Sequence, residues 1–283
     1  MRNYIELTKP RITILILICA AVGFVVGTTG PIRIATLINA LLGTALMASG
    51  TAALNQWYEA AADSKMRRTR LRPIPNGRIP RDRALYFGLF LSVAGYADLW
   101  LGTNRLAALL GLFTLLSYLL IYTPMKQRSP ACTTLGAIPG AMPPLIGFAA
   151  ASGTSTREAW ALFLILFVWQ FPHFYSIAWL YREDYARAGI RMLPVVEPDG
   201  EATARRILSG ALFLLPVTLL PRMLGMAGAA YAMVAITATL GLLLTAVLFD
   251  RRKTAARARQ ILLATVLYLP IVLLALMVDR HVG

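Results

Sequence analysis

Charged residues are scarce in this chain. They make up 14% of its 283 residues, whereas hydrophobic residues make up 58%. An ordinary soluble domain carries about a quarter of its residues as charged side chains, so this composition excludes that class. The mean hydropathy of +0.63 predicts a protein that crosses a membrane several times.

Cysteine and histidine are also rare, with two of each. Cys19 and Cys132 show no spacing typical of a disulfide framework or a zinc site, so we expect both to be packing residues. The first residues resemble neither a cleavable signal nor an arginine- and serine-rich transit peptide. The simplest predicted location is a bacterial plasma (inner) membrane, as a multi-pass protein.

Nine apolar stretches approach the roughly 20 residues that a helix needs to cross the hydrocarbon layer. They cover 12–29, 34–57, 84–102, 106–124, 134–151, 159–181, 207–224, 227–249 and 260–279. No linker or low-complexity segment divides them. We therefore predict an all-α polytopic membrane bundle of nine transmembrane helices that forms one domain, residues 1–283.

Acidic residues are fewer than basic ones, 13 against 28, and the net charge is +15. If the nine spans alternate from an N-terminus inside the cell, 23 of the 28 Lys and Arg residues fall on the inner side. This asymmetry follows the positive-inside rule and predicts a cytoplasmic N-terminus. Nucleic-acid binding is not expected, since basic residues are not interleaved with exposed aromatic ones.

The few acids include a regular series at the end of the second span. Asn55, Glu59 and Asp63 are four residues apart, so on a helix they would line one face, each about 6 Å beyond the last. Amide and carboxylate oxygens are ligands that Mg²⁺ prefers. The alternative is a solvated helix end whose acids pair with Lys65, Arg67 or Arg68. Acids embedded in a membrane are usually functional, which favours the metal site.

Arginines follow these acids directly, and a second polar cluster follows the sixth span. Arg68 and Arg72 could bind a metal-bound diphosphate, although the positive-inside rule alone also explains basic residues there. The sixth span carries Trp169, Gln170 and His173, of which His173 is either a substrate contact or a packed residue.

Further polar groups mark the fourth and fifth spans. Lys126, with Tyr122 one turn earlier, could reach a phosphate at the same interface. Glycines and prolines at 136–147 either make room in the bundle or allow close helix packing.

Five motifs together carry a resemblance to a known family, which begins at LTKPRI (7–12). They are N-x-x-x-E-x-x-x-D with M-x-R-T-x-x-R-P (55–73), YTPMK (122–126), GAIPGAMPPLIG (136–147), WQFPHF (169–174) and YREDYARAGIRMLPV (181–195). The chain resembles the UbiA superfamily of intramembrane prenyltransferases, and within it the enzymes that farnesylate heme. The resemblance covers nearly the whole chain.

The resemblance implies nine helices around a central cavity, Mg²⁺ as cofactor, farnesyl diphosphate and heme b as substrates, and heme O as product. It also implies contact with heme A synthase or oxidase assembly proteins. The catalytic residues would be Asn55, Glu59, Asp63 and Asp184, and the metal ligands Asn55, Glu59, Asp63, Glu183 and Asp184. Diphosphate would contact Lys9, Arg68, Arg72, Tyr122 and Lys126, and heme would contact His173, Gln170 and Trp169.

Two positions depart from the family pattern. Many members carry two aspartates four residues apart where this chain has Tyr181 and Tyr185, which leaves the adjacent pair Glu183 and Asp184. Cys132 stands where an asparagine is expected.

Two other functions fit parts of the pattern. A UbiA-type prenyltransferase for an aromatic quinone or chlorin acceptor would keep the diphosphate site. A secondary transporter would carry charged sites near the bilayer midplane, whereas the acids here gather at the inner ends of the spans.

Overall fold

The computed structural model describes residues 2–280. In this range the chain is helical, and its one strand-like feature is an isolated bridge between Ala227 and Arg280. The elements are α1 (Arg2–Leu7), α2 (Pro10–Gly27), α3 (Ile34–Asp63), α4 (Arg81–Gly102), α5 (Arg105–Leu116), the π-helix η1 (Ser117–Tyr122), α6 (Thr123–Met125), α7 (Cys132–Ser152), α8 (Arg157–Leu180), α9 (Arg182–Arg187), α10 (Leu193–Val196), α11 (Glu201–Thr218), α12 (Leu220–Met223), α13 (Ala229–Arg251) and α14 (Ala255–Val278).

Nine helical segments of residues 2–280 are long and apolar enough to cross a membrane, judged by length and composition. They correspond to the nine predicted stretches, so the all-α membrane bundle is confirmed. One span combines α5, η1 and α6 (Arg105–Met125), and another combines α11 and α12 (Glu201–Met223). The chain is a multi-pass membrane protein.

The predicted boundaries differ most at α3. Its apolar stretch was expected to end at residue 57, but the helix runs for 30 residues to Asp63. At 1.5 Å per residue it is about 45 Å long, which exceeds a hydrocarbon layer of about 30 Å. Hydropathy detects only the membrane part, whereas Ala60, Ala61 and Ala62 favour continued helix. Likewise α11 begins at Glu201 rather than at 207.

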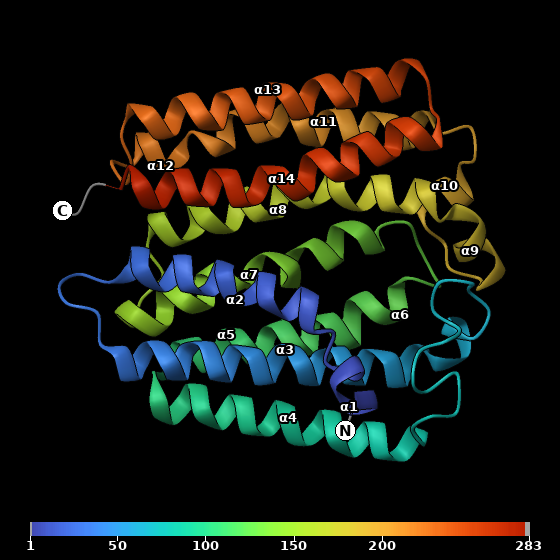
Figure 1. The fold of residues 1–283 in the computed structure, drawn as a ribbon, viewed down its shortest axis with the longest axis horizontal. Coiled ribbons are helices and arrows are strands. Elements are labelled where there is room, and N and C mark those ends of the chain that lie inside the picture. The colour runs from blue at the N-terminus through green and yellow to red at the C-terminus, as the bar shows by residue number, and fades with distance from the viewer. Residues whose placement is uncertain (1, 281–283) are drawn as a thin grey trace.

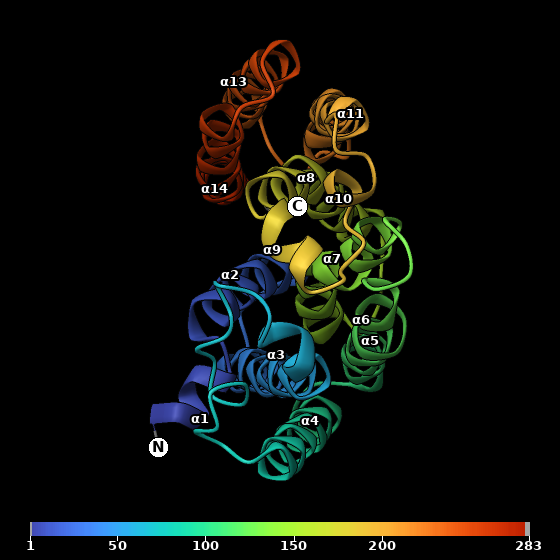
Figure 2. The ribbon, with the colours of Figure 1, turned by 90° about the vertical axis from the view of Figure 1, so that its right-hand side faces the viewer.

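The long helices lie roughly side by side along the long axis of the molecule (Figure 1). Seen along that axis, α13 and α11 lie at one edge of the bundle and α4 at the opposite edge (Figure 2). Between them α3 packs on α4, α2 packs on α7, and α8 contacts α7, α11 and α14. Large apolar side chains also point outward, as at Leu101 (83% exposed) and Val278 (80% exposed). Such an exterior suits lipid as the surrounding solvent.

Glycines let α2 and α7 approach closely. A Cβ atom on Gly23 would lie 2.0 Å from the carbonyl oxygen of Pro144, and one on Gly147 would lie 1.9 Å from that of Ala20. Neither backbone group can move without breaking its helix. Gly147, the last glycine of the 136–147 segment, therefore serves close helix packing.

The connections at one end of the bundle are tied together. They are the segment 64–80, the turn after α6, and the chain from α9 to α10, at the right of Figure 1. The Asp184 carboxylate accepts hydrogen bonds from the backbone N–H groups of Arg67 and Arg68, both at 3.3 Å. The Arg191 N–H donates to the Lys126 carbonyl at 2.8 Å. Residues from three distant parts of the chain thereby meet at this end.

Candidate functional site

The polar residues at the end of α3 are buried. Asn55 is 1% exposed and Asp63 is fully buried, while the Glu59 side chain is 11% exposed. All three belong to the last three turns of one helix, as their spacing predicted. Asn55 accepts a long hydrogen bond of 3.4 Å from the Tyr118 hydroxyl. Its amide nitrogen is buried and has no partner among the described residues.

Both acids of this series are held by cations. The Arg72 Nη1 atom lies 2.8 and 2.7 Å from the two carboxylate oxygens of Asp63. The Lys126 Nζ atom lies 2.8 Å from Glu59 Oε1. The alternative prediction paired these acids with Lys65, Arg67 or Arg68. It is wrong, because their partners are Arg72 and Lys126. Lys126 comes from the end of α6, so its pairing is a tertiary contact that local sequence does not reveal.

Positive charge exceeds negative charge in this region because Lys9 and Arg68 lie nearby as well. Burial, together with the positive charges of Arg72 and Lys126, lowers the pKa of Lys9 to about 7. The Lys9 backbone is left-handed, with φ at 48°, directly before Pro10 at the start of α2. That conformation is costly for a residue with a Cβ atom and is held here by the surrounding structure.

Arg68 is positioned by two tyrosines, Tyr181 at the end of α8 and Tyr185 in α9. Its guanidinium lies over the Tyr181 ring, 4.7 Å from the centroid, and its Nη2 atom donates to the Tyr185 hydroxyl at 3.3 Å. These are the two tyrosines at which the sequence was expected to depart from the family pattern. They hold a cation by their ring faces and a hydroxyl group instead of by carboxylate charge.

The second acidic pair behaves differently from the first. Asp184 is buried, accepts from the two backbone N–H groups of segment 64–80, and forms an ion pair with Arg187. Glu183 is exposed. Within residues 2–280 no group of three or more His, Cys, Asp and Glu residues is placed to hold a metal. A metal role for Glu183 and Asp184 stays a prediction.

A cavity of about 440 Å³ lies inside the bundle, within the size range of ligand sites. Lys9 and Arg68 border it, together with Tyr118, Tyr122 and Tyr185. The remaining lining is largely apolar and comes from α2, α3, α4, α5, α7, α8 and α14. The central cavity implied by the resemblance is present, but α11 and α13 contribute none of its lining. Asn55, Glu59 and Asp63 are also absent from the lining, because their cationic and tyrosine partners stand beside them.

Tyr118 and Tyr122 belong to the π-helical turn η1. Their rings are 4.9 Å apart, edge to face, and the Lys126 ammonium lies 4.4 Å from the centroid of the Tyr122 ring. π-Helical turns are rare and frequently occur at functional sites. Tyr118 was not predicted as a site residue, although its spacing of four from Tyr122, and of four again to Lys126, could have indicated it.

The three residues predicted to contact heme all border the cavity: Trp169, Gln170 and His173. The Trp169 and His173 rings stack, with centroids 4.7 Å apart and planes at 18°. The Gln170 amide donates to the Ala137 carbonyl at 3.0 Å. A Cβ atom on Gly140 would lie 2.0 Å from Gln170 Oε1, so this glycine makes room for a cavity side chain.

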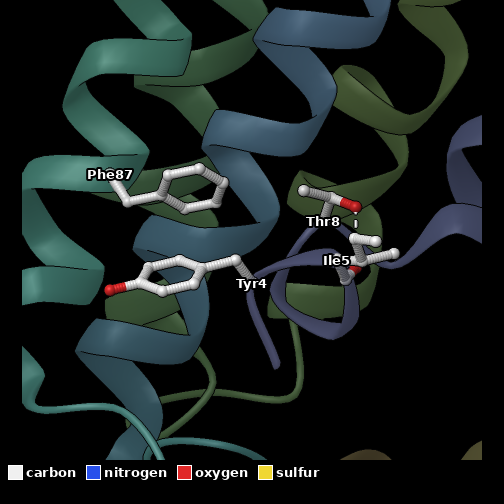
Figure 3. Close-up of a pocket in the computed structure, with 4 residues that line it drawn as sticks. All are labelled: Tyr4, Ile5, Thr8 and Phe87. Carbon is white, nitrogen blue, oxygen red and sulfur yellow. Dashed lines mark hydrogen bonds between the residues drawn. The ribbon is translucent and has the colours of Figure 1, made fainter. Parts of the chain in front are cut away.

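An open apolar groove of about 560 Å³ lies elsewhere, between α1 and α4 (Figure 3). It is lined by Tyr4, Ile5, Thr8 and Phe87, and the Tyr4 and Phe87 rings meet edge to face at 5.0 Å. None of these side chains is charged. The groove therefore lacks the groups that chemistry on a phosphate ester would need, and the inner cavity remains the candidate site.

Both cysteines are buried and free, as expected of packing residues. The Cys132 thiol lies 3.7 Å from the Met192 sulfur, in a small cluster beneath α9. At this position a soft apolar contact has replaced the polar group that the family pattern would lead one to expect.

An apolar cavity inside a membrane bundle, with tyrosines and surplus cations at one end beside buried acids, defines a class of protein. This class comprises membrane proteins whose internal site suits an amphiphile with an anionic head and a long apolar body. The chain belongs to the UbiA prenyltransferase family, whose model matches residues 16–276.

Individual relatives agree with this membership. The chain is 54% identical to a protoheme IX farnesyltransferase of Solibacter usitatus over 99% of both chains. Its fold is similar to that in a structure of digeranylgeranylglyceryl phosphate synthase, with a TM-score of 0.82, 18% identity, and 98% and 97% of the two chains covered. It is also similar to a UbiA homolog from Archaeoglobus fulgidus bound to GPP and Mg²⁺, with a TM-score of 0.70, 17% identity, and 97% and 99% covered.

Proposed function

We propose that this protein transfers the farnesyl group of farnesyl diphosphate to a vinyl group of heme b, with addition of water, and so makes heme O for heme-copper oxidases. The observation that carries the proposal is one cavity with a cationic end, formed by Lys9 and Arg68, and an otherwise largely apolar lining, next to the buried ion pairs of Asp63 and Glu59. The identity to a protoheme IX farnesyltransferase over essentially full length supports heme as the acceptor.

Farnesyl diphosphate would bind with its head among Lys9, Arg68, Arg72, Tyr122 and Lys126. The carboxylates of Glu59 and Asp63 and the amide oxygen of Asn55 are hard ligands of the kind that Mg²⁺ takes. The Asn55 amide nitrogen is buried without a partner among the described residues, and the amide oxygen accepts only a long hydrogen bond from Tyr118. These residues therefore fit Mg²⁺, and Glu183 and Asp184 are the further acids that we propose as metal ligands. Bound Mg²⁺ would stabilise the charge that develops on the departing diphosphate.

The two ion pairs indicate how the diphosphate head group would bind. Arg72 and Lys126 neutralise Asp63 and Glu59 in the present arrangement. With the carboxylates engaged by Mg²⁺, Arg72 and Lys126 would be free to donate charge-assisted hydrogen bonds to phosphate oxygens, and such bonds are strong. Because the groups are already assembled and buried, little reorganisation is needed when the allylic carbon–oxygen bond breaks.

The apolar part of the cavity holds the farnesyl chain and the flat macrocycle, and it limits premature capture of the farnesyl cation by water. A heme vinyl group then attacks the cation. Water captures the resulting benzylic-type cation and loses a proton to the released diphosphate or to solvent, which leaves a hydroxyethylfarnesyl substituent. Trp169, Gln170 and His173 are the side chains on the acceptor side.

We further propose that this multi-pass protein lies in a bacterial inner membrane with its N-terminus in the cytoplasm. The end that carries Arg68, Arg72 and Lys126 then faces the cytoplasm. Farnesyl diphosphate, whose head group is charged, can enter from that side. Heme A synthase or oxidase assembly proteins would be partners that receive heme O.

The proposal is tested with membranes that contain the protein, heme b, farnesyl diphosphate and Mg²⁺, by mass analysis of extracted heme. We expect a product heavier than heme b by one farnesyl group and one hydroxyl group, and its loss with a chelator or with Asp63→Ala. Asp82→Ala is the matched control, because Asp82 is an exposed acid in the first turn of α4. Product from Asp63→Ala at the control level would contradict the proposal. A panel of quinone and chlorin acceptors tests the alternative, which requires one of them to be prenylated in preference to heme b.

A further inference from the structure

One hydroxyl on α14 contacts the only cavity histidine. Thr265 is fully buried, and its Oγ1 atom lies 2.9 Å from His173 Nδ1. The Thr265 carbonyl oxygen also accepts from the Trp169 indole N–H at 2.8 Å. A single residue of α14 thus holds both stacked rings of α8.

The hydrogen bonds around Thr265 define the tautomer of His173. A hydroxyl group has one proton, and Thr265 donates it to the Leu262 carbonyl at 2.8 Å, the common back-bond of threonine in a helix. Thr265 Oγ1 is then an acceptor for His173, so the proton of the imidazole is on Nδ1. In neutral imidazole the other nitrogen, Nε2, keeps a free lone pair.

The free nitrogen belongs to a residue that borders the cavity. Among the described residues, Nε2 has no hydrogen-bond partner. The buried side-chain atoms that lack a partner do not include it, so Nε2 is not enclosed by protein. The ring is fixed in direction by Thr265 on one edge and in plane by the stacked Trp169. The cavity residues that follow on α8 are Phe174 and Ile177, which are apolar.

The His173 ring is half-buried. A neutral imidazole with one N–H committed to an oxygen is the usual form of a histidine that ligates a metal. We propose that Thr265 is a positioning residue: it holds His173 as the Nδ1–H tautomer, so that Nε2 ligates the iron of the heme acceptor and anchors the macrocycle in the cavity. This inference rests on the proposed function, since it requires heme to enter.

The test is a titration of the purified full-length protein with ferric heme b, followed by absorbance and electron paramagnetic resonance. We expect the spectrum of a histidine-ligated heme. His173→Gly should lose that spectrum and recover it when imidazole is added to the solution. Thr265→Val should weaken heme binding about tenfold and alter the ligand-field signature, whereas Thr265→Ser, which keeps the hydroxyl, should not.

Thr245→Val is the matched control, because Thr245 makes the same back-bond, to the Leu242 carbonyl, on neighbouring α13 and does not border the cavity. Heme binding with an unchanged spectrum in His173→Gly overturns the ligation, while the farnesyl transfer would stand. Equal effects of Thr265→Val and Thr245→Val overturn the role of Thr265. A protein that binds no heme at all overturns the proposed function and this inference together.

Discussion

Two acidic clusters lie at the same end of the bundle, yet the structure uses them differently. Glu59 and Asp63 on α3 are paired with cationic side chains, Glu59 with Lys126 beyond α6 and Asp63 with Arg72 nine residues further along the chain. Asp184 on α9 binds mainly backbone N–H groups of segment 64–80, and its neighbour Glu183 is exposed. A carboxylate paired with a mobile side chain can exchange partners, whereas one that accepts backbone hydrogen bonds holds a loop in place. From this difference we propose that ligand binding belongs chiefly to α3 and loop docking chiefly to α9.

The largest expected effect is at α3. Glu59→Gln should lower farnesyl transfer about 10³-fold, since it removes a charge that acts on the diphosphate site and leaves Lys126 without its anion. Rates of heme O formation at saturating substrates measure this, with Asp82→Asn as the control. A loss of less than tenfold would contradict the role assigned to the α3 acids.

Asp184→Asn should act on stability first. The amide can accept only through its one oxygen, so one of the two backbone N–H groups is left unpaired, at a cost of about 1 to 3 kcal/mol. We expect a lower thermal unfolding midpoint of the detergent-solubilised protein. Asp199→Asn, at an exposed acid of the same connection, should leave the midpoint unchanged. If Asp184→Asn instead abolished transfer without any change in stability, a direct metal role for α9 would be favoured.

The pH dependence of diphosphate binding should report on Lys9. With a pKa of about 7, Lys9 loses its proton as the pH rises through neutrality, and a bound anion favours the protonated form. Affinity should therefore fall about tenfold per pH unit above pH 7, up to the raised pKa of the complex. Calorimetry of farnesyl diphosphate with Mg²⁺ between pH 6 and 9 measures this. In Lys9→Met, the affinity should vary with pH only as farnesyl diphosphate itself titrates. If the variant and the unchanged protein gave parallel curves of affinity against pH, the role of Lys9 would be contradicted.

The smallest effect is expected at Arg187. It pairs with Asp184, but its side chain is 38% exposed, so solvent screens the pair. Arg187→Ala should lower the free energy of unfolding by less than about 1 kcal/mol. Arg72→Ala is the counterpart at the α3 cluster and should cost more, because it leaves the fully buried Asp63 unpaired. Equal losses would remove the distinction between the clusters.

Much of the membrane architecture was predictable because it depends on composition over long stretches. The nine spans follow from hydropathy, and errors at α3 and α11 arose where helices continue beyond the apolar layer. The series Asn55, Glu59 and Asp63 was predictable from a spacing of four on one helix. The partners of these acids were not, because Arg72 and Lys126 are no more basic than Lys65 or Arg67, and only packing selects among them.

Local sequence therefore determined what depends on short range: which segments are helical, which of them are apolar enough for lipid, and which polar residues share a helix face. The tertiary structure alone decided which charges meet, that Asp184 binds the backbone of another loop, and that Thr265 of α14 holds His173 of α8. The physical reason is that hydropathy and helical period act along the chain. Ion pairs and hydrogen bonds depend on distances of about 3 Å between segments that only folding brings together.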